Sequence, residues 1–365
     1  MDTPLQALIQ RIRTAADQGT PLRIRGGGTK DFYGEQLHGE LLETGALTGI
    51  TSYEPTELVV TARAGTPLAE LEAVLAERGQ CLPFEPPHFA QGGTVGGMVA
   101  AGLSGPARAS VGAARDYVLG LTMVNGRGEA LTFGGQVMKN VAGYDVSRLM
   151  VGAMGTLGLI VELSLKVLPV APAEATLKFE MDQTQALVRL NQWGGQPLPL
   201  NASCWVRDRG TDTLYLRLRG AVAAVEAACK VLGGERQDNA QVAPDWTLCR
   251  DQRLPWFDER GGRDLWRLSV PQTAPVLELP EPPLIEWHGA LRWARADAAD
   301  AARLRDAAAR VGGHATLFVA GSNRSAPATH RFCALASPLE RIHRELKKQF
   351  DPAGVFNRDR LYAGL

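Results

Sequence analysis

The sequence has no excess of charge of either sign. Lysine and arginine together number 39, and aspartate and glutamate also number 39, so the formal net charge is zero. A protein that binds nucleic acid over a broad surface needs a clustered basic excess. The composition therefore argues against a nucleic-acid partner.

Long hydrophobic runs are also missing, because no stretch reaches the roughly 20 apolar residues that a transmembrane helix needs. The first residues have the spacing of an amphipathic helix rather than of a signal peptide, with apolar positions at Leu5, Leu8, Ile9, Ile12 and Ala16. We therefore expect a cytoplasmic protein without a transmembrane segment.

Cysteine is scarce and scattered, and no two cysteines form a CxxC pair. The five are Cys81, Cys204, Cys229, Cys249 and Cys333. This spacing argues against a disulfide framework, a zinc ribbon and an iron–sulfur cluster. We expect reduced thiols.

The chain, with 365 residues, is long enough for about two domains, and its character changes near Pro169. Before that point it is rich in glycine and β-branched residues. The pattern predicts strands at 22–25, 58–61, 116–125 and 158–170, with a hairpin that turns at 125–128 and returns at 129–133. Thr66 and Pro67 have the positions of an N-cap and a first helical residue for a helix that ends before Gly79.

Residues 174–320 alternate helices with paired strands, which favours antiparallel sheets covered by helices on one face. Helices are predicted at 183–193, 222–232 and 297–311, the last with Asp297 as its N-cap. The predicted strands are 175–180, 202–207, 213–218, 265–270, 285–293 and 315–320. The order suggests two rounds of a weak internal repeat, although an accidental similarity is equally compatible with it. A last helix is predicted at 339–350.

Glycine-rich loops are the main functional signal in the first part. Arg25 precedes Gly26, Gly27, Gly28 and Thr29, and further clusters follow at 91–105, 139–145 and 155–158. Successive amides in such loops can bind an anion, because no Cβ blocks close approach. Neither GxxxxGK[ST] nor GxGxxG is present. Four such loops suit a dinucleotide better than a mononucleotide, although tight turns alone also explain glycine.

The motifs RGGGTK, EPPHFAQGGTVGGMVAAGLSGP, RDYVLG, GGQVMKNVAGYDVSRLM and GTLGLI resemble the PCMH-type FAD-binding domain of the vanillyl-alcohol-oxidase superfamily. VMKNVAGYDVSRLMVGAMGTLG, GGHATLF and FDPAGVFNRDRLY are more narrowly similar to the FAD-binding E subunits of glycolate oxidase. The resemblance covers nearly the whole chain. It implies an α+β fold in which a PCMH-type domain of two α/β subdomains carries a ferredoxin-like antiparallel cap. The implied boundaries are 1–171 for the FAD domain, 172–335 for the cap and 336–365 for a tail that returns to the FAD domain.

The resemblance also implies which residues bind FAD. The first loop would bind the pyrophosphate, the second would line phosphate and ribose, the third would lie nearer the flavin, and the backbone of Ile160 would contact the nucleotide end. The implied cofactor-binding residues are Arg25, Gly26, Gly27, Gly28, Thr29, Gly92, Gly93, Thr94, Gly97, Asn140, Gly143, Tyr144 and Ile160. Many relatives tether FAD through a histidine in the first loop, where this chain has Thr29 and Lys30. We therefore expect non-covalent FAD.

Four residues of the second part are candidates for substrate chemistry, since oxidation of a hydroxy acid needs a base and a cation for the carboxylate. Alternation along a strand at 285–293 would place Glu286, His288 and Arg292 on one face, as base and carboxylate clamp. A solvated face with an ordinary surface histidine is the alternative. His314, which opens a later strand, is either a ligand or a structural hydrogen bonder. The paired metal-binding histidines of the related D subunits have no equivalent, so no metal site is expected.

Two functions follow from the resemblance. The first is an FAD-binding subunit of a hetero-oligomeric glycolate dehydrogenase, which converts glycolate to glyoxylate. It would act as an accessory or an electron relay beside a catalytic D-type flavoprotein and an iron–sulfur F-type subunit, in the cytoplasm or at the inner membrane through the complex. The second is a stand-alone FAD oxidoreductase for a hydroxy acid or sugar alcohol. A module that has lost flavin is disfavoured because the loops are intact.

Overall fold

The polypeptide divides into two units, each built around its own antiparallel sheet. The computed structural model describes residues 3–135, 145–322 and 330–365. The first unit comprises Met1–Leu103, Ala113–Val170 and Ala334–Leu365, and the second comprises Ser104–Gly112 and Ala171–Cys333. The C-terminal tail thus packs with the N-terminal part of the chain. The short segment 104–112, which follows the second glycine loop, packs with the second unit. No sequence signal had indicated that this segment leaves the first unit.

A five-stranded antiparallel sheet is the centre of the first unit. Its order is β3 (Ile50–Glu54), β4 (Val59–Arg63), β8 (Leu159–Lys166), β6 (Val118–Val124) and β7 (Ala130–Gly134). The predicted hairpin is confirmed: Asn125 closes its turn by accepting hydrogen bonds from the amides of Arg127 and Glu129, at 2.9 and 3.0 Å. Two helices, α2 (Leu68–Ala76) and α3 (Val95–Ala101), bury their apolar residues against this sheet.

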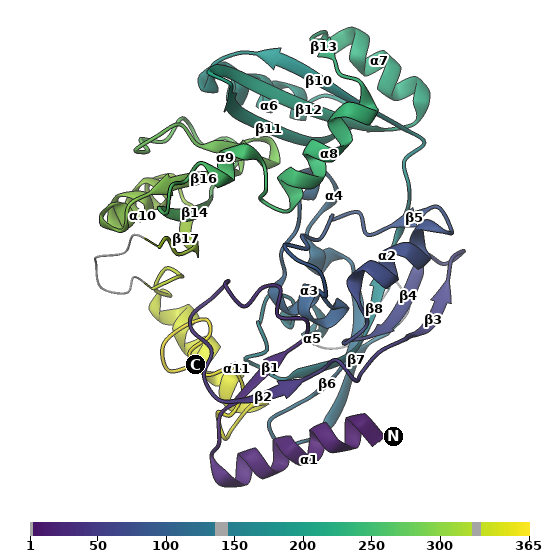
Figure 1. Cartoon of the computed structure of the whole chain (residues 1–365), viewed down its shortest axis with the longest axis vertical. Helices are drawn as coiled ribbons and strands as arrows, with labels where there is room; N and C mark the ends of the chain where they lie inside the picture. Colours follow the sequence, from purple (N-terminus) through teal and green to yellow (C-terminus); the bar gives the residue numbers. More distant parts are fainter. Residues whose placement is uncertain (1–2, 136–144, 323–329) are drawn as a thin grey trace. The chain divides into compact units, whose positions relative to one another are not determined.

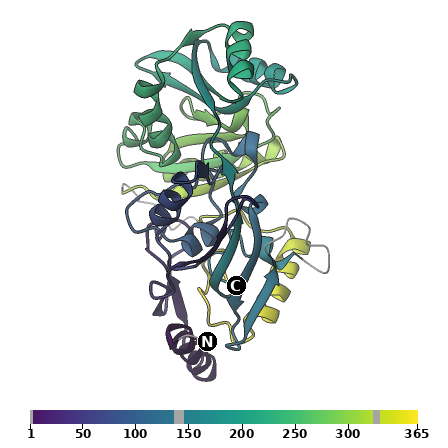
Figure 2. The same ribbon diagram turned by 90° about the vertical axis from the view of Figure 1, so that its right-hand side faces the viewer.

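A smaller layer lies beside the N-terminal helix of the same unit (Figure 1). Strands β1 (Leu22–Arg25) and β2 (Glu40–Glu43) pair in parallel. Helix α1 (Thr3–Gln18) buries Leu5, Leu8, Ile9 and Ile12 against them, so the predicted amphipathic helix is confirmed. The C-terminal helix α11 (Ser337–Phe350) runs beside the β7 edge of the five-stranded sheet in Figure 2, where Phe350 contacts Phe133 with ring centroids 6.5 Å apart.

Four short elements in the first unit and three helices in the second lie outside the two main sheets. In the first unit they are β5 (Gln80–Cys81), η1 (Ala114–Asp116), α5 (Val146–Leu149) and β9 (Leu168–Pro169). In the second unit they are α4 (Arg108–Val111), α8 (Asn239–Arg250) and α9 (Pro255–Asp258). No helix within the described residues is long and apolar enough to span a membrane.

The second unit is built around an eight-stranded antiparallel sheet made of two rounds with the same connectivity. The first round is β10 (Ala173–Glu180), α6 (Gln183–Gly194), β11 (Leu200–Asp208), β12 (Thr211–Gly220), α7 (Val222–Leu232) and β13 (Glu235–Arg236). The second is β14 (Asp264–Ser269), β15 (Leu284–Glu286), β16 (Leu291–Ala296), α10 (Ala301–Arg310) and β17 (His314–Val319), with η2 (Trp287–Gly289) and η3 (Ala298–Asp300) as single turns.

Both rounds place their strands in the same spatial order, with the fourth strand beside the first and the third between the first and the second. This is the ferredoxin-like arrangement, and in the second round a loop replaces the first helix. The two rounds join where β11 pairs with β15. The repeat that the sequence left undecided is therefore present in the topology, and the predicted antiparallel cap is confirmed.

Three local predictions were wrong. The predicted strand 285–293 is a tight hairpin, because Trp287, His288 and Gly289 adopt left-handed backbone angles and β15 folds back to pair with β16. Thr66 does not cap α2: its hydroxyl bonds both backbone groups of Gly49, and Pro67 takes the cap position. Asp297 precedes the single turn η3, makes no capping bond, and lies outside α10.

Candidate functional site

The first glycine loop lines a cavity that lies wholly within the first unit. Its empty volume is about 770 Å³, part of it open to solvent. The walls come from the end of β1, from the start of α3, from the loop before β8 and from the C-terminal tail. The lining residues are Ile24, Arg25, Gly26, Gly27, Gly28, Thr29, Lys30, Asp31, Leu37, Thr44, Ala64, Thr94, Gly96, Gly97, Ala100, Ala101, Met154, Gly155, Gly158, Ile160, Asn357 and Arg360.

The loop after β1 is closely packed at each of its three glycines. A Cβ on Gly26 would lie 2.3 Å from the Thr94 hydroxyl, and one on Gly27 would lie 1.6 Å from the carbonyl oxygen of Gly92. Gly28 has a φ of +72°, which favours glycine, and a Cβ there would lie 2.2 Å from the guanidinium of Arg25. Gly26 and Gly27 are therefore pressed against the second glycine loop, and a side chain at Gly27 would overlap the backbone of that loop.

This loop also provides hydrogen-bond donors. The backbone amides of Gly26, Gly27 and Gly28 donate no hydrogen bond to any described residue. Unsatisfied amides in a glycine turn form an anion-binding nest. The cations Arg25, paired with Asp31 at 2.9 Å, and Lys30, whose Nζ lies 3.4 Å from the Thr29 hydroxyl, stand at the same loop. The donor set fits a phosphate-bearing ligand such as the FAD pyrophosphate.

The second glycine loop leads directly into α3 and caps its N-terminus. Thr94 is its N-cap, and the Thr94 hydroxyl accepts a hydrogen bond from the amide of Gly97 at 3.2 Å. Gly96 packs on the strand side of the cavity, since a Cβ there would lie 2.6 Å from the Cβ of Ala64. The compact helix start therefore forms one wall of the cavity.

The structure brings together most of the predicted cofactor-binding residues. Those that line the cavity are Arg25, Gly26, Gly27, Gly28, Thr29, Thr94, Gly97 and Ile160. Gly92 and Gly93 do not line it: Gly92 packs behind Gly27, and Gly93 accepts a hydrogen bond from the amide of Leu68. Asn140, Gly143 and Tyr144 lie outside the described residues. Sequence reasoning missed Asn357 and Arg360, although the quoted motif FNRDRLY contains both.

Glu286, His288 and Arg292 do not share a strand face, so the geometric premise for their catalytic roles was wrong. Their exposed fractions are 1%, 8% and 0%, and the hairpin turn separates Glu286 from Arg292. The carboxylate of Glu286 accepts a hydrogen bond from the indole of Trp293 at 2.6 Å. The solvated-face alternative is equally wrong, because the three side chains are buried.

His288 and Arg292 bond to structural partners. The two ring nitrogens of His288 lie 2.9 Å from the Ser110 hydroxyl and 3.2 Å from the Ser203 hydroxyl. Burial lowers the pKa of His288 to about 4, so the ring is neutral near pH 7. Its bonds tie α4 to β11 within the second unit.

Arg292 donates to the carbonyl oxygens of Gly289, Ala274 and Pro275, at 2.7, 3.1 and 3.4 Å. Burial lowers the pKa of Arg292 to about 10, which leaves it charged near pH 7. These bonds hold the loop before β15 in place. They do not favour the predicted role of Arg292 as a residue that binds a substrate carboxylate.

A different group of cations lies on the second unit. The guanidinium of Arg108 lies 4.3 Å from the ring centroid of Trp287, and that of Arg267 lies 5.0 Å from the same ring. Within the described residues Arg267 has no carboxylate partner. Desolvation lowers the pKa of the His314 imidazole, and the charge of Arg267 lowers it further. Nothing in the sequence had singled out Arg108 or Arg267, because the pair is assembled around Trp287 from distant segments.

Three comparisons with known proteins bear on this site. A family model described as an FAD binding domain matches residues 4–134. The glycolate oxidase subunit GlcE of Escherichia coli (strain K12) is 46% identical over 361 residues, which cover 99% of this chain and 98% of that protein. The glycolate oxidase subunit GlcD of Bacillus subtilis (strain 168) is 31% identical over 46% of this chain, and this region is 36% of that protein.

The solved structures agree on the fold. A structure titled alkyldihydroxyacetonephosphate synthase superposes with a TM-score of 0.67 at 15% identity, over 96% of this chain and 74% of that one. Together with the cavity and the antiparallel second unit, these matches define a flavoprotein with a PCMH-type FAD-binding domain. Within that class, the chain belongs to the family of the glycolate oxidase subunit GlcE.

Proposed function

We propose that this chain is the FAD-binding E-type subunit of a hetero-oligomeric glycolate dehydrogenase, which oxidises glycolate to glyoxylate. The observation that carries the proposal is the match to GlcE over nearly the full length of both chains. Oxidation of the alcohol carbon removes two electrons and two protons, and bound FAD supplies the two-electron acceptor. The role of this chain is accessory or electron-relaying.

FAD binds in the cavity of the first unit without a covalent bond. The amides of the first glycine loop, with Arg25 and Lys30, hold the pyrophosphate, while Thr94, Gly97 and Ile160 line the nucleotide. By the family resemblance, the tethering histidine of many relatives would lie in the neighbourhood of Thr29 and Lys30, and neither of these residues is a histidine. The purified chain should bind FAD, and acid precipitation should release the flavin into the supernatant. Flavin retained on the denatured chain, or failure to take up added FAD, would contradict this assignment.

The partners are a GlcD-like catalytic flavoprotein and an iron–sulfur subunit, in the cytoplasm or bound at the inner membrane through the complex. The match to a GlcD chain over 46% of this chain supports a partner that is homologous to this subunit. Co-expression with candidate partners, followed by flavin counting and a glycolate assay, tests the assembly. Purification of this chain free of both partners from such cells would contradict it.

A stand-alone FAD oxidoreductase for hydroxy acids is the second candidate, and the arginine pair on Trp287 favours it. Arg267 has no carboxylate partner within the described residues, and a guanidinium recognises a carboxylate well. The two candidates differ in whether the isolated chain turns over a hydroxy acid.

A further inference from the structure

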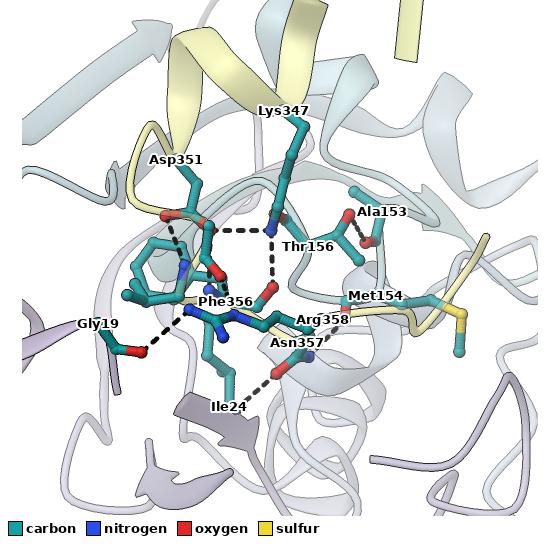
Figure 3. Close-up of polar contacts among 12 residues, drawn as sticks. Gly19, Ile24, Ala153, Met154, Thr156, Lys347, Asp351, Phe356, Asn357 and Arg358 are labelled. Carbon is teal, nitrogen blue, oxygen red and sulfur yellow. Dashed lines mark hydrogen bonds and ion pairs between the residues drawn. The ribbon is translucent and has the colours of Figure 1, made fainter. Parts of the chain in front are cut away.

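The C-terminal tail contains a buried ion pair, and its lysine also anchors the tail to the rest of the first unit (Figure 3). Lys347 Nζ donates to the carbonyl oxygens of Thr156 and Phe356, at 2.8 and 2.7 Å, and pairs with the Asp351 carboxylate at 2.8 Å. All three ammonium donors are thus used. Asp351, which is 1% exposed, also accepts the amides of Val355 and Phe356 at 3.0 and 2.8 Å.

This anchoring places residues 355–357 beside β1, with a parallel bridge between Leu22 and Phe356. The amide of Leu22 donates to Val355 at 2.7 Å, and the amide of Asn357 donates to Leu22 at 3.0 Å. The Val355 and Phe356 side chains are fully buried in the core beneath β1 and α1. The tail is therefore part of the layer from which the first glycine loop emerges.

Asn357 then joins two walls of the cavity. Its carboxamide oxygen accepts the amide of Ile24 at 2.8 Å, two residues before Gly26, and its nitrogen donates to the Met154 carbonyl oxygen at 2.6 Å. Figure 3 shows the side chain of Asn357 between these two segments. The fit is close, because a Cβ on Gly155 would lie 2.6 Å from the Asn357 nitrogen.

Arg360 fixes the other end of the loop. It is 4% exposed and donates to the carbonyl oxygens of Lys30, Asp31 and Glu35, the first two at 3.3 and 3.1 Å. The tail thus binds the backbone immediately before and after Gly26–Thr29. Before the loop the tail accepts the Ile24 amide, and after the loop it donates to the carbonyl oxygens of Lys30 and Asp31. The amides of Gly26, Gly27 and Gly28 donate to no described residue.

We propose that Asn357 is a positioning residue for the FAD site, and that FAD binding and docking of the C-terminal tail stabilise each other. A glycine loop of this kind gains affinity when its amides are held in the binding geometry before the ligand arrives. If docking of the tail favours FAD, then FAD must favour docking by the same factor. The proposal rests on FAD binding in this cavity.

The direct test compares FAD dissociation constants, measured by quenching of flavin fluorescence, for the wild type and Asn357→Ala. We expect FAD to bind Asn357→Ala on the order of tenfold to a hundredfold more weakly, because two hydrogen bonds that shape the loop are lost. In Asn357→Asp the acceptor for Ile24 remains, but an oxygen faces the Met154 carbonyl, so FAD binding should also weaken. Asn191→Ala is the matched control, since it removes two amide-to-carbonyl bonds in the second unit.

The second test uses the wild-type chain, so it does not depend on whether the Asn357 variants fold. Hydrogen exchange at the amides of Val355 and Phe356 should slow by at least severalfold when FAD saturates the protein. Unchanged exchange, or variants at Asn357 that bind FAD as tightly as Asn191→Ala does, would overturn the inference. A wild-type chain that takes up no FAD would instead refute the proposed cofactor, so the two failures are distinguishable.

Discussion

At the scale of single residues, the FAD cavity depends on positions that exclude a side chain. Gly28 combines a positive φ with a guanidinium 2.2 Å from where its Cβ would be. Gly28→Val should therefore raise the FAD dissociation constant by about a hundredfold or more, because the added methyl groups occupy phosphate space and strain the backbone. Flavin content after saturation and desalting measures the effect.

Gly210→Val is the matched control for this substitution. Gly210 has a φ of +87° but no atom lies within 4 Å of its Cβ position, so it carries the strain without the crowding. The second unit should remain folded in Gly28→Val, and tryptophan fluorescence reports this, since all seven tryptophans lie between residues 193 and 293. Normal flavin content in Gly28→Val would show that the loop is only a turn.

The buried His288 should make the stability of the second unit depend on pH. Its pKa is about 4 in the folded chain, against an ordinary value of 6.5, so between these values the unfolded chain binds more protons. The free energy of unfolding of the second unit should rise with pH across this window and fall as the solution is acidified, by about 3 kcal/mol at most. Denaturant titrations followed by tryptophan fluorescence at several pH values measure the slope.

The contribution of His288 is the difference between the wild type and His288→Asn, which suits the left-handed backbone at this position. The variant should lose the part of the slope that His288 contributes between pH 4 and 6.5, while the part that comes from the lowered pKa of His314 should remain. His38→Asn replaces an exposed histidine of the first unit and should leave the slope unchanged. Equal slopes for wild type and His288→Asn would show that the ring is not held neutral by burial.

At the scale of elements, Arg292 decides between a structural and a catalytic reading of the β15–β16 hairpin. Arg292→Met leaves two carbonyl oxygens of the loop before β15, and that of Gly289 in the hairpin turn, without their donor. The second unit should lose about 3 kcal/mol of unfolding free energy, while FAD affinity should not change. Arg303→Met, on the exposed face of α10, is the control. If Arg292→Met kept its stability but its flavin was no longer reduced by a hydroxy acid, Arg292 would be a carboxylate-binding residue after all.

The same hairpin shows what could and could not be predicted from the sequence. Most strands and helices were evident from periodicity, because their buried faces follow one another along the chain. Residues 285–293 look like one strand, since Trp287 and His288 are not typical turn residues and Gly289 is the only turn signal. Comparison with the first round, which has a hairpin at the same step, would have located the turn.

The FAD site was predictable only where its residues are contiguous. The glycine loops are visible as motifs, but Asn357 contacts Ile24 across 333 residues of sequence, and nothing local indicates that contact. The roles of Glu286, His288 and Arg292 depended on which way each side chain points, and the turn changed that. The face on which a side chain lies can be inferred only from regular secondary structure. That inference fails where the backbone is irregular.

At the scale of the whole molecule, the question is whether this chain oxidises a hydroxy acid alone. A productive site must bind the carboxylate, position the hydroxyl and accept its proton together. His288 is buried and bonded, and Arg292 is bonded to backbone. Within the described residues no three acidic, histidine or cysteine side chains are arranged to hold a metal ion. Glycolate is small, so it has few other groups whose binding could compensate.

We therefore expect the isolated FAD-loaded chain not to oxidise glycolate at a useful rate. Stopped-flow measurement of flavin absorbance under anaerobic conditions, with glycolate or D-lactate, tests this expectation directly. Fast and saturable bleaching would favour the stand-alone enzyme, and loss of that bleaching in Arg267→Met would assign the carboxylate to the arginine pair on Trp287. If bleaching requires the partner subunits and then affects both flavins, the chain relays electrons. If only the partner's flavin is reduced, the FAD of this chain serves the assembly, because electrons from the substrate never reach it.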